Sequence, residues 1–248
     1  MDLGLQGRTA LVSSATRGIG LAIVRRLAEE GARVVVAART AADVERVAAE
    51  VGGAGVATDL TSEEGCRAAI AACGEGPDVL VNGLGLRAGT GWSDSGAAQF
   101  EQAMAGNLLP AVRLSELALP GMRRRGWGRI VTVSSIFGRE AGGAPAYNAA
   151  KAAEISFTTS LAREVASGGV TVNAVAPGSI LYEGGSWWRR TQQDPEGMAA
   201  FVKRELPLGR FGRAEEVASA VAFLCSDPAS LLTGVCIPVD GGQSRSNI

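Results

Sequence analysis

The stretch TALVSSATRGIG, residues Thr9–Gly20, decides the fold. It starts as a short apolar run typical of a buried strand, passes through a turn, and enters a segment of helical period over Gly20–Glu29. A strand, a glycine-containing turn and a helix start together form an anion site, because backbone N–H groups and the helix dipole point at a pyrophosphate. A Gly-x-Gly alone also fits a plain strand–helix turn, so the rest of the chain must decide.

Short apolar runs and segments of helical period alternate along the whole chain. Most runs are rich in β-branched residues without polar alternation, which is typical of parallel strands buried on both faces. The predicted strands are Thr9–Ser13, Arg33–Ala38, Val56–Thr58, Val79–Val81, Arg129–Val133, Thr171–Val175 and Val235–Val239. The predicted helices are Gly20–Glu29, Ala41–Val51, Ser62–Ala72, Gln99–Arg124, Tyr147–Ser167 and Ala214–Leu224. The pattern predicts an α/β protein: one Rossmann-type, doubly wound domain over residues 1–248, with about seven parallel strands and helices on both faces.

The segment Ser179–Glu205 interrupts this rhythm directly after a strand end. Ligands of open parallel sheets bind outside the carboxyl ends of the strands, so the segment is placed to cover a substrate. We therefore expect a lid at about residues 179–205, in which Trp187 and Trp188 either face the substrate or pack in the core.

The charge balance argues against nucleic acid and membranes as partners. Lys and Arg number 24 against 25 Asp and Glu, which leaves a net charge of -1 and no long-range attraction to polyanions. Arg123–Arg125, with Trp127 and Arg129 nearby, is interpreted as a helix C-terminus stabilised by the helix dipole. Any anion must therefore be bound locally.

Histidine and cysteine usage excludes further classes of function. The chain has no His, which excludes Ser-His-Asp hydrolysis and His-ligated zinc. The cysteines lack CxxC spacing, so we expect no metal site and interpret them as reduced, buried fillers: Cys66, Cys73, Cys225 and Cys236. Neither a signal-like N-terminus nor an apolar run of membrane-spanning length is present, and we expect a cytoplasmic protein.

A cation rather than an acid follows the second predicted strand. Proteins that prefer NAD place a carboxylate there for the ribose 2′-hydroxyl, whereas an arginine accommodates the 2′-phosphate of NADP. Here Ala38 ends the strand, Arg39 follows it and Arg17 lies in the glycine turn, which favours NADPH over the alternative of two solvated arginines. Asp59, after the third strand, is placed to accept from the adenine amino group or to cap the next helix.

A second group of residues is suited to proton transfer. Tyr147 and Lys151 share one helix face at i and i+4, so the ammonium can approach the phenol and favour its phenolate. Ser135, at the end of the fifth strand, could hold a substrate oxygen while Tyr147 protonates the alkoxide formed by hydride delivery from a nicotinamide. A Tyr-x-x-x-Lys pair alone is also common on helix surfaces.

Taken together, the motifs resemble those of the short-chain dehydrogenase/reductase family over essentially the whole chain. In family order they are Ser14 with Gly18–Gly20, Asn82–Gly85, Asn107, Ser135 with Tyr147 and Lys151, and Asn173–Gly178. Within that family the stretches Pro207–Arg213 and Val239–Gly242 are most similar to 3-oxoacyl-acyl-carrier-protein reductases.

The resemblance implies an NADPH-dependent oxidoreductase with defined residue roles. Tyr147 would be the acid/base, Ser135 the oxyanion partner and Lys151 the ligand of the nicotinamide ribose, while Asn107 would hold a proton-relaying water. The implied cofactor contacts are Ser14, Thr16, Arg17, Gly18, Ile19, Gly20, Arg39, Asp59, Leu60, Asn82, Gly83, Pro177, Gly178 and Ile180. The implied partners are a small carbonyl substrate, free or bound to a carrier protein, and further copies of the chain in a homotetramer.

The chain departs from the family pattern at three sites. Ser14 replaces the first glycine of the turn and brings a Cβ into it. Gly83 and Leu84 alter an Asn-Asn-Ala-Gly run, and Tyr182 stands where the family often has Thr. None is a proton-transfer residue, so we expect catalysis to survive and cofactor affinity to be affected.

Three functions are compatible with these residues. The leading one is NADPH-dependent reduction of a 3-oxoacyl or polyketide-like ketone to a secondary alcohol. The second is an NAD(P)-dependent dehydrogenase of a polyol or hydroxylated ring. The third, motivated by Ser14 and the altered Asn82–Gly85 run, is a non-catalytic nucleotide-binding regulatory protein; the complete set of proton-transfer residues argues against it.

Overall fold

Seven of the described strands form one parallel sheet, and the first strand of the chain lies near the middle of that sheet. In the computed structural model, which describes residues 1–247, seven strands pair in the order β3-β2-β1-β4-β5-β6-β9. Their bounds are β1 Thr9–Ser13, β2 Arg33–Ala38, β3 Ala54–Ala57, β4 Val79–Asn82, β5 Gly128–Val133, β6 Val170–Pro177 and β9 Cys236–Val239. The chain builds outward from β1 to β3, returns to β4 and continues to β9. This order confirms the predicted doubly wound α/β fold.

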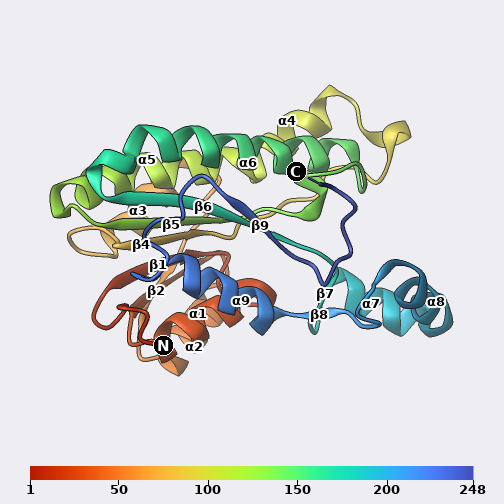
Figure 1. The fold of residues 1–248 in the computed structure, drawn as a ribbon, viewed down its shortest axis with the longest axis horizontal. Coiled ribbons are helices and arrows are strands. Elements are labelled where there is room, and N and C mark those ends of the chain that lie inside the picture. Colours follow the sequence, from red (N-terminus) through yellow and green to blue (C-terminus); the bar gives the residue numbers. More distant parts are fainter. Residues whose placement is uncertain (248) are drawn as a thin grey trace.

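Helices cover both faces of the sheet (Figure 1). One layer holds α1 Gly18–Glu29, α2 Ala41–Glu50 and α9 Ala214–Leu224; the other holds α3 Glu63–Ala71, α4 Ala97–Gly106, α5 Leu108–Arg125 and α6 Pro145–Val165. Successive residues of one strand enter opposite cores: Val12 packs in the α1–α9 layer and Leu11 in the α3–α5 layer. Burial on both faces explains why the strand sequences show no polar alternation.

Additional short elements lie beyond the carboxyl ends of the strands. They are β7 Ile180–Leu181, α7 Ser186–Gln193, α8 Pro195–Glu205 and β8 Gly212–Arg213. In Figure 1, α7 and α8 project from the end of the molecule next to β7 and β8. The Trp187 ring fastens this segment, because its centroid lies 4.7 Å from that of Phe201 and 5.5 Å from that of Phe211.

The predicted helix Gln99–Arg124 is wrong in one respect, because two helices occupy that stretch. α4 ends at Gly106 and α5 begins at Leu108, and Asn107 between them has φ -121° and ψ -68°. Pro110 supplies a physical reason: it has no N–H to donate to the Gly106 carbonyl, and its ring crowds that carbonyl in a continuous helix. The break places Asn107 at a corner, where its side chain forms hydrogen bonds with Leu86 in the loop after β4.

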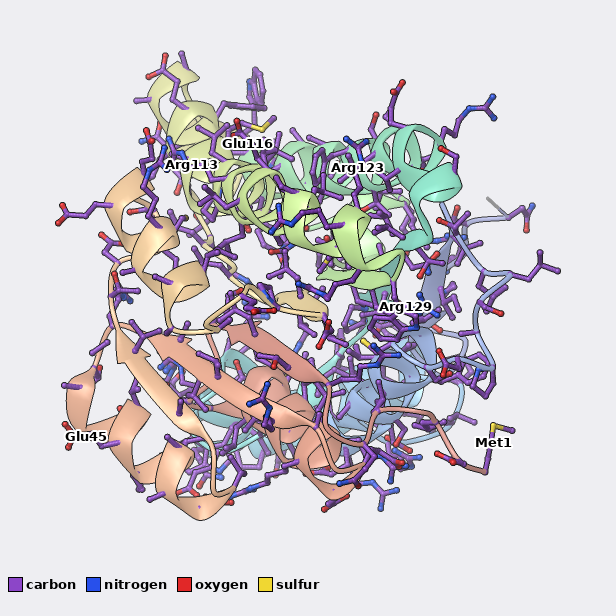
Figure 2. All side chains as sticks on the ribbon, turned by 90° about the vertical axis from the view of Figure 1, so that its left-hand side faces the viewer. Met1, Glu45, Arg113, Glu116, Arg123 and Arg129 are labelled. Atoms are coloured by element: carbon purple, nitrogen blue, oxygen red, sulfur yellow. The ribbon has the colours of Figure 1, made fainter. Side chains whose placement is uncertain are left out.

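The basic stretch at the end of α5 is engaged with its own fold. Figure 2 shows Arg123 in the helical layer and Arg129 below it, where the strands lie. The Arg125 Nε lies 2.8 Å from the Asp78 carboxylate, and the Arg123 guanidinium donates to the carbonyl of Glu164. The Trp127 ring lies between the guanidinium groups of Arg8 and Arg129, at 3.8 and 4.3 Å from its centroid. These contacts agree with the interpretation of a structural helix terminus.

The cysteines also behave as predicted. Cys66, Cys73 and Cys225 are free and buried, and Cys236 is half-buried. Burial raises the pKa of Cys225 to about 12, so its thiol stays protonated and unreactive at neutral pH. Within residues 1–247, no helix has the length and apolar character needed to cross a membrane.

Candidate active site

The glycine turn, residues Ser14–Gly20, connects β1 to the first turn of α1. Ser14 has φ +55°, the left-handed region, and a Cβ on Gly20 would collide with the Ser14 carbonyl oxygen. The turn is therefore tight, and it directs the N-terminus of α1 toward a cavity lined by Arg17 and Ile19. Backbone N–H groups at such a helix start suit a phosphate group.

Replacing Ser14 with Gly should stabilise the protein. A non-glycine residue in the left-handed region costs roughly 1 kcal/mol, and within residues 1–247 the Ser14 hydroxyl makes no hydrogen bond that would offset this cost. We expect Ser14→Gly to raise the free energy of unfolding by about 0.5–1 kcal/mol in urea denaturation without cofactor. A lower stability would show that the serine side chain supports the turn.

Two cavities meet at the glycine turn and share Ser14, Arg17 and Gly85. The first, here the arginine cavity, contains these predicted residues: Ser14, Thr16, Arg17, Arg39, Asp59 and Leu60. The second, here the tyrosine cavity, contains Ser14, Arg17, Ile19, Gly20, Gly83, Ser135, Tyr147, Lys151, Pro177, Gly178 and Ile180. An elongated ligand could therefore extend from Arg39 to Tyr147 past the N-terminus of α1.

Three predicted residues are not in either lining. Gly18 is covered by the Tyr182 ring, because a Cβ on Gly18 would lie 2.7 Å from that ring. Asn82 and Asn107 are both buried, with exposed fractions of 4% and 1%. Asn82 and Asn107 can therefore affect a bound ligand only through the residues that line the cavities. Gly18 can contact a ligand only if Tyr182 moves.

Asn82 is a buried residue at the end of β4, next to Gly83 of the tyrosine cavity. Its buried amide Nδ2 and Oδ1 have no partner within residues 1–247, and buried amide groups without partners are rare. The strands around it are fixed, since the Ser13 hydroxyl accepts from Gly83 N at 2.8 Å and donates to the Val81 carbonyl at 3.2 Å. The glycine turn, the two connected cavities and this amide fit a dinucleotide.

Asp59 faces the arginine cavity but does not cap a helix. Its Oδ1 accepts from the backbone N–H of Thr61 at 2.9 Å and from the Thr61 hydroxyl at 2.8 Å, while Ser62 caps α3. These hydrogen bonds hold the pKa of Asp59 below its ordinary value, so it is a carboxylate at neutral pH. The capping alternative was therefore wrong in detail, because the cap lies three residues further on.

The proton-transfer residues come from β5 and α6. Ser135 follows the end of β5, and its Oγ accepts from Phe137 N at 3.2 Å, which leaves its proton free to donate elsewhere. α6 carries Tyr147 and Lys151, and the Lys151 Nζ lies 5.7 Å from the Tyr147 ring centroid. The Ser134 hydroxyl donates to the Lys151 carbonyl at 2.9 Å and joins the two elements. The expected Ser135, Tyr147 and Lys151 group therefore assembles at one cavity.

Lys151 has a partner that sequence reasoning missed. Its Nζ lies 3.0 Å from both carboxylate oxygens of Glu154 and donates to the Val133 carbonyl at 3.1 Å. Lys151 is 2% exposed and Glu154 1%. Burial acts to lower the pKa of Lys151, but Glu154, together with Tyr147, outweighs it, and that pKa lies above its ordinary value. The ammonium is thus held charged inside the protein.

The Asn107 side chain fixes the loop that follows β4. Its Nδ2 donates to the carbonyls of Leu86 and Ala103, at 2.9 and 2.7 Å, and its Oδ1 accepts from Leu86 N at 3.1 Å. A Cβ on Gly85 would lie 3.8 Å from both Asn107 Oδ1 and Lys151 Nζ, so both side chains approach Gly85. The hydrogen bonds of its side-chain amide are all made within the protein. Its main-chain carbonyl lies at the corner between α4 and α5.

Five residues of the segment 179–205 line the tyrosine cavity: Ser179, Ile180, Tyr182, Ser186 and Trp187. Trp187 therefore combines both predicted alternatives, since it lines the cavity and also packs against Phe201. Trp188 is half-buried and does not line the cavity.

Two charged residues of the site were not singled out from sequence. Glu154 lies three residues after Lys151, and helix spacing, which places residues three or four apart on one face, could have found it as it linked Tyr147 to Lys151. Arg87 lines the tyrosine cavity, and its guanidinium carbon lies 5.6 Å from the Tyr147 ring centroid. Its position in the sequence, two residues after Gly85, does not indicate that it would lie near Tyr147.

Comparison with known proteins agrees with this geometry. A family model described as Enoyl-(Acyl carrier protein) reductase matches residues 14–244. The chain is 38% identical over 253 residues to the 3-oxoacyl-(acyl-carrier-protein) reductase of Pseudomonas aeruginosa, covering 98% of this chain and 100% of that protein.

Solved structures give the same result. L-sorbose reductase from Gluconobacter frateurii, complexed with NADPH and L-sorbose, has a TM-score of 0.92 and 31% identity, covering 99% of this chain and 100% of that one. A variant actinorhodin polyketide ketoreductase with NADPH has a TM-score of 0.89 and 33% identity, covering 96% and 98%. The chain belongs to the short-chain dehydrogenase/reductase family of NAD(P)-dependent carbonyl reductases and alcohol dehydrogenases.

Proposed function

We propose that the protein reduces a ketone to a secondary alcohol with NADPH. One observation carries this proposal: Ser135, Tyr147 and Lys151 line a cavity that continues past the glycine turn to Arg39. A non-catalytic nucleotide-binding role would not require three proton-transfer residues to meet at the ligand cavity.

The chain's residues have distinct tasks in this reduction. The bound dinucleotide supplies hydride to the carbonyl carbon. The Ser135 hydroxyl donates to the carbonyl oxygen, and the Tyr147 phenol gives its proton to the alkoxide that develops there. Lys151, held charged by Glu154, favours the phenolate left on Tyr147. We assign the Asn107 main-chain carbonyl, at the corner between α4 and α5, to hold the water that restores the proton.

The cofactor choice rests on Arg39. Together with Arg17 it lines the arginine cavity, and Ala38 leaves the end of β2 without a carboxylate. NADPH should bind more tightly than NADH, and Arg39→Asp should reduce the ratio of their affinities by about 10- to 100-fold or reverse it. Fluorescence titration with both cofactors measures the ratio, and Arg124→Asp, an exposed position on α5, controls for the change in net charge. Equal or tighter NADH binding by the unmodified protein would refute the assignment.

The substrate class comes from the relatives. The 3-oxoacyl-(acyl-carrier-protein) reductase and the polyketide ketoreductase support a 3-oxoacyl or polyketide-like ketone, free or on a carrier protein. The second candidate, oxidoreduction of a polyol, is favoured by the structural likeness to L-sorbose reductase. A panel of 3-oxoacyl thioesters, cyclic ketones and ketoses, assayed by NADPH absorbance, separates the two. Absence of NADPH oxidation with every ketone would overturn the proposed function.

The assembly and the lid complete the proposal. We assign residues 179–205 as a lid over the tyrosine cavity in a single domain spanning 1–248, because Tyr182 and Trp187 reach that cavity from α7 and the chain before it. A homotetramer and a cytoplasmic location remain the expectations from the family, with α5 and α6 as the long helices available to a symmetric partner.

A further inference from the structure

Three cationic side chains and no acidic ones line the tyrosine cavity. The cations are Arg17, Arg87 and Lys151. Clefts lined by one sign of charge concentrate ligands of the opposite sign. The cavity as a whole is therefore suited to anions, and the three cations must be considered separately.

Two of these cations already have a task. Lys151 is paired with the buried Glu154 carboxylate at 3.0 Å. Arg17 lies on the glycine turn and also lines the arginine cavity beside Arg39, so the phosphates of the cofactor account for it. Neither cation is therefore left to bind a charged group of the substrate.

Arg87 is different because it lies outside the elements assigned to cofactor binding. It lies on the loop after β4, lines only the tyrosine cavity of the two, and makes no ion pair or hydrogen bond within residues 1–247. Its guanidinium carbon stands 5.6 Å from the ring centroid of Tyr147. An arginine offers a planar fork that binds a carboxylate through two parallel hydrogen bonds.

We propose that Arg87 binds a carboxylate of the substrate, so that the protein acts on a short oxo acid and, in reverse, on the corresponding hydroxy acid. This inference rests on the proposed function and narrows its substrate class. Because the guanidinium lies beside the Tyr147 ring, the carboxylate it binds stands close to the carbonyl that Tyr147 protonates. An acyl thioester on a carrier protein has no charge at that position.

The reaction balances without a further reactant. The carbonyl carbon gains a C–H bond from the hydride that a bound cofactor would supply, the carbonyl π bond breaks, and the oxygen takes the proton of Tyr147. The carboxylate keeps its charge throughout, and Arg87 binds it in both substrate and product. Arg87 thus determines specificity and takes no part in proton transfer.

The test compares one ketone with and without the charge. We would measure kcat/KM for 3-oxobutanoate and for its methyl ester in the unmodified enzyme, in Arg87→Gln and in Arg124→Gln. The unmodified enzyme should favour the acid, and Arg87→Gln should lower kcat/KM for the acid by about 30-fold while changing the ester by less than about twofold. Arg124→Gln should change neither substrate. Arg87→Lys should recover part of the loss, because a single ammonium keeps the charge without the fork.

Each contrary result has a definite meaning. An unmodified enzyme that favours the ester, or an equal effect of Arg87→Gln on both substrates, would overturn the carboxylate assignment while leaving ketone reduction in place. An NADPH dissociation constant weakened tenfold or more in Arg87→Gln would instead assign Arg87 to the cofactor. Inactivity toward acid, ester and the wider ketone panel would overturn the proposed function and this inference with it.

Discussion

Replacing Lys151 with Met should lower the free energy of unfolding by about 3–5 kcal/mol, because it leaves the Glu154 carboxylate buried without its partner. Both side chains are almost wholly excluded from solvent, and the Nζ contacts both carboxylate oxygens at 3.0 Å. Urea denaturation of the protein without cofactor measures the loss. Lys151→Met should also abolish turnover if the ammonium favours the Tyr147 phenolate, as the proposed function assigns.

A double variant separates these two effects. Lys151→Met with Glu154→Leu replaces the ion pair by apolar side chains of similar volume, which is often neutral or stabilising. We expect it to recover most of the lost stability and none of the activity. Equal stability of the unmodified protein and the single variant would contradict the buried pair, and an unstable double variant would attribute the cost to packing.

The pH dependence of this effect has a defined sign. The pKa of Lys151 is raised in the folded protein, because the Glu154 attraction outweighs burial. A raised pKa contributes stability that is complete below the unfolded value of about 10.4 and is lost as the pH rises through the folded value. Burial also raises the pKa of Glu154, and Lys151→Met removes the attraction that opposes this shift. The stability difference between the unmodified protein and Lys151→Met should therefore grow as the pH rises above the unfolded Glu value of about 4.3.

The order of strands and helices was accessible from sequence because its signals are local. Strands such as β1 and β2, buried on both faces, read as runs of β-branched and apolar residues, and the glycine turn identified the first helix start. The break at Asn107 was missed although Pro110 signalled it. The helices of residues 179–205 were also not predicted individually, because their half-buried faces pack on one another rather than on the sheet.

The residues of the candidate site likewise include some that local sequence spacing predicts and some that it does not. Ser135, Tyr147 and Lys151 lie within one strand–loop–helix unit, so their spacing predicts their meeting. Tyr182 covers Gly18, and Arg87 approaches Tyr147, only because distant parts of the chain pack together. Glu154 lay within reach of helix spacing, but its near-complete burial depends on the sheet beneath α6. Tertiary packing, which the local sequence pattern does not reveal, determines where these side chains lie.

Replacing Tyr147 with Phe should reduce turnover by about 10²–10⁴-fold. The phenol proton is needed only as the alkoxide develops, so its loss raises the barrier without removing a ground-state contact to the cofactor. The Tyr147 ring remains in place beside Arg87 in this variant, which preserves the shape of the cavity. The NADPH dissociation constant should therefore stay within about twofold of that of the unmodified protein.

The most direct test of the account is single-turnover hydride transfer in Tyr147→Phe, measured beside its NADPH dissociation constant. The variant is saturated with NADPH, mixed rapidly with a ketone that the unmodified enzyme reduces, and followed by loss of NADPH absorbance. We predict normal NADPH binding and a transfer rate reduced by at least about 100-fold. Near-normal transfer would contradict the account, because Tyr147 would then have no part in protonating the product.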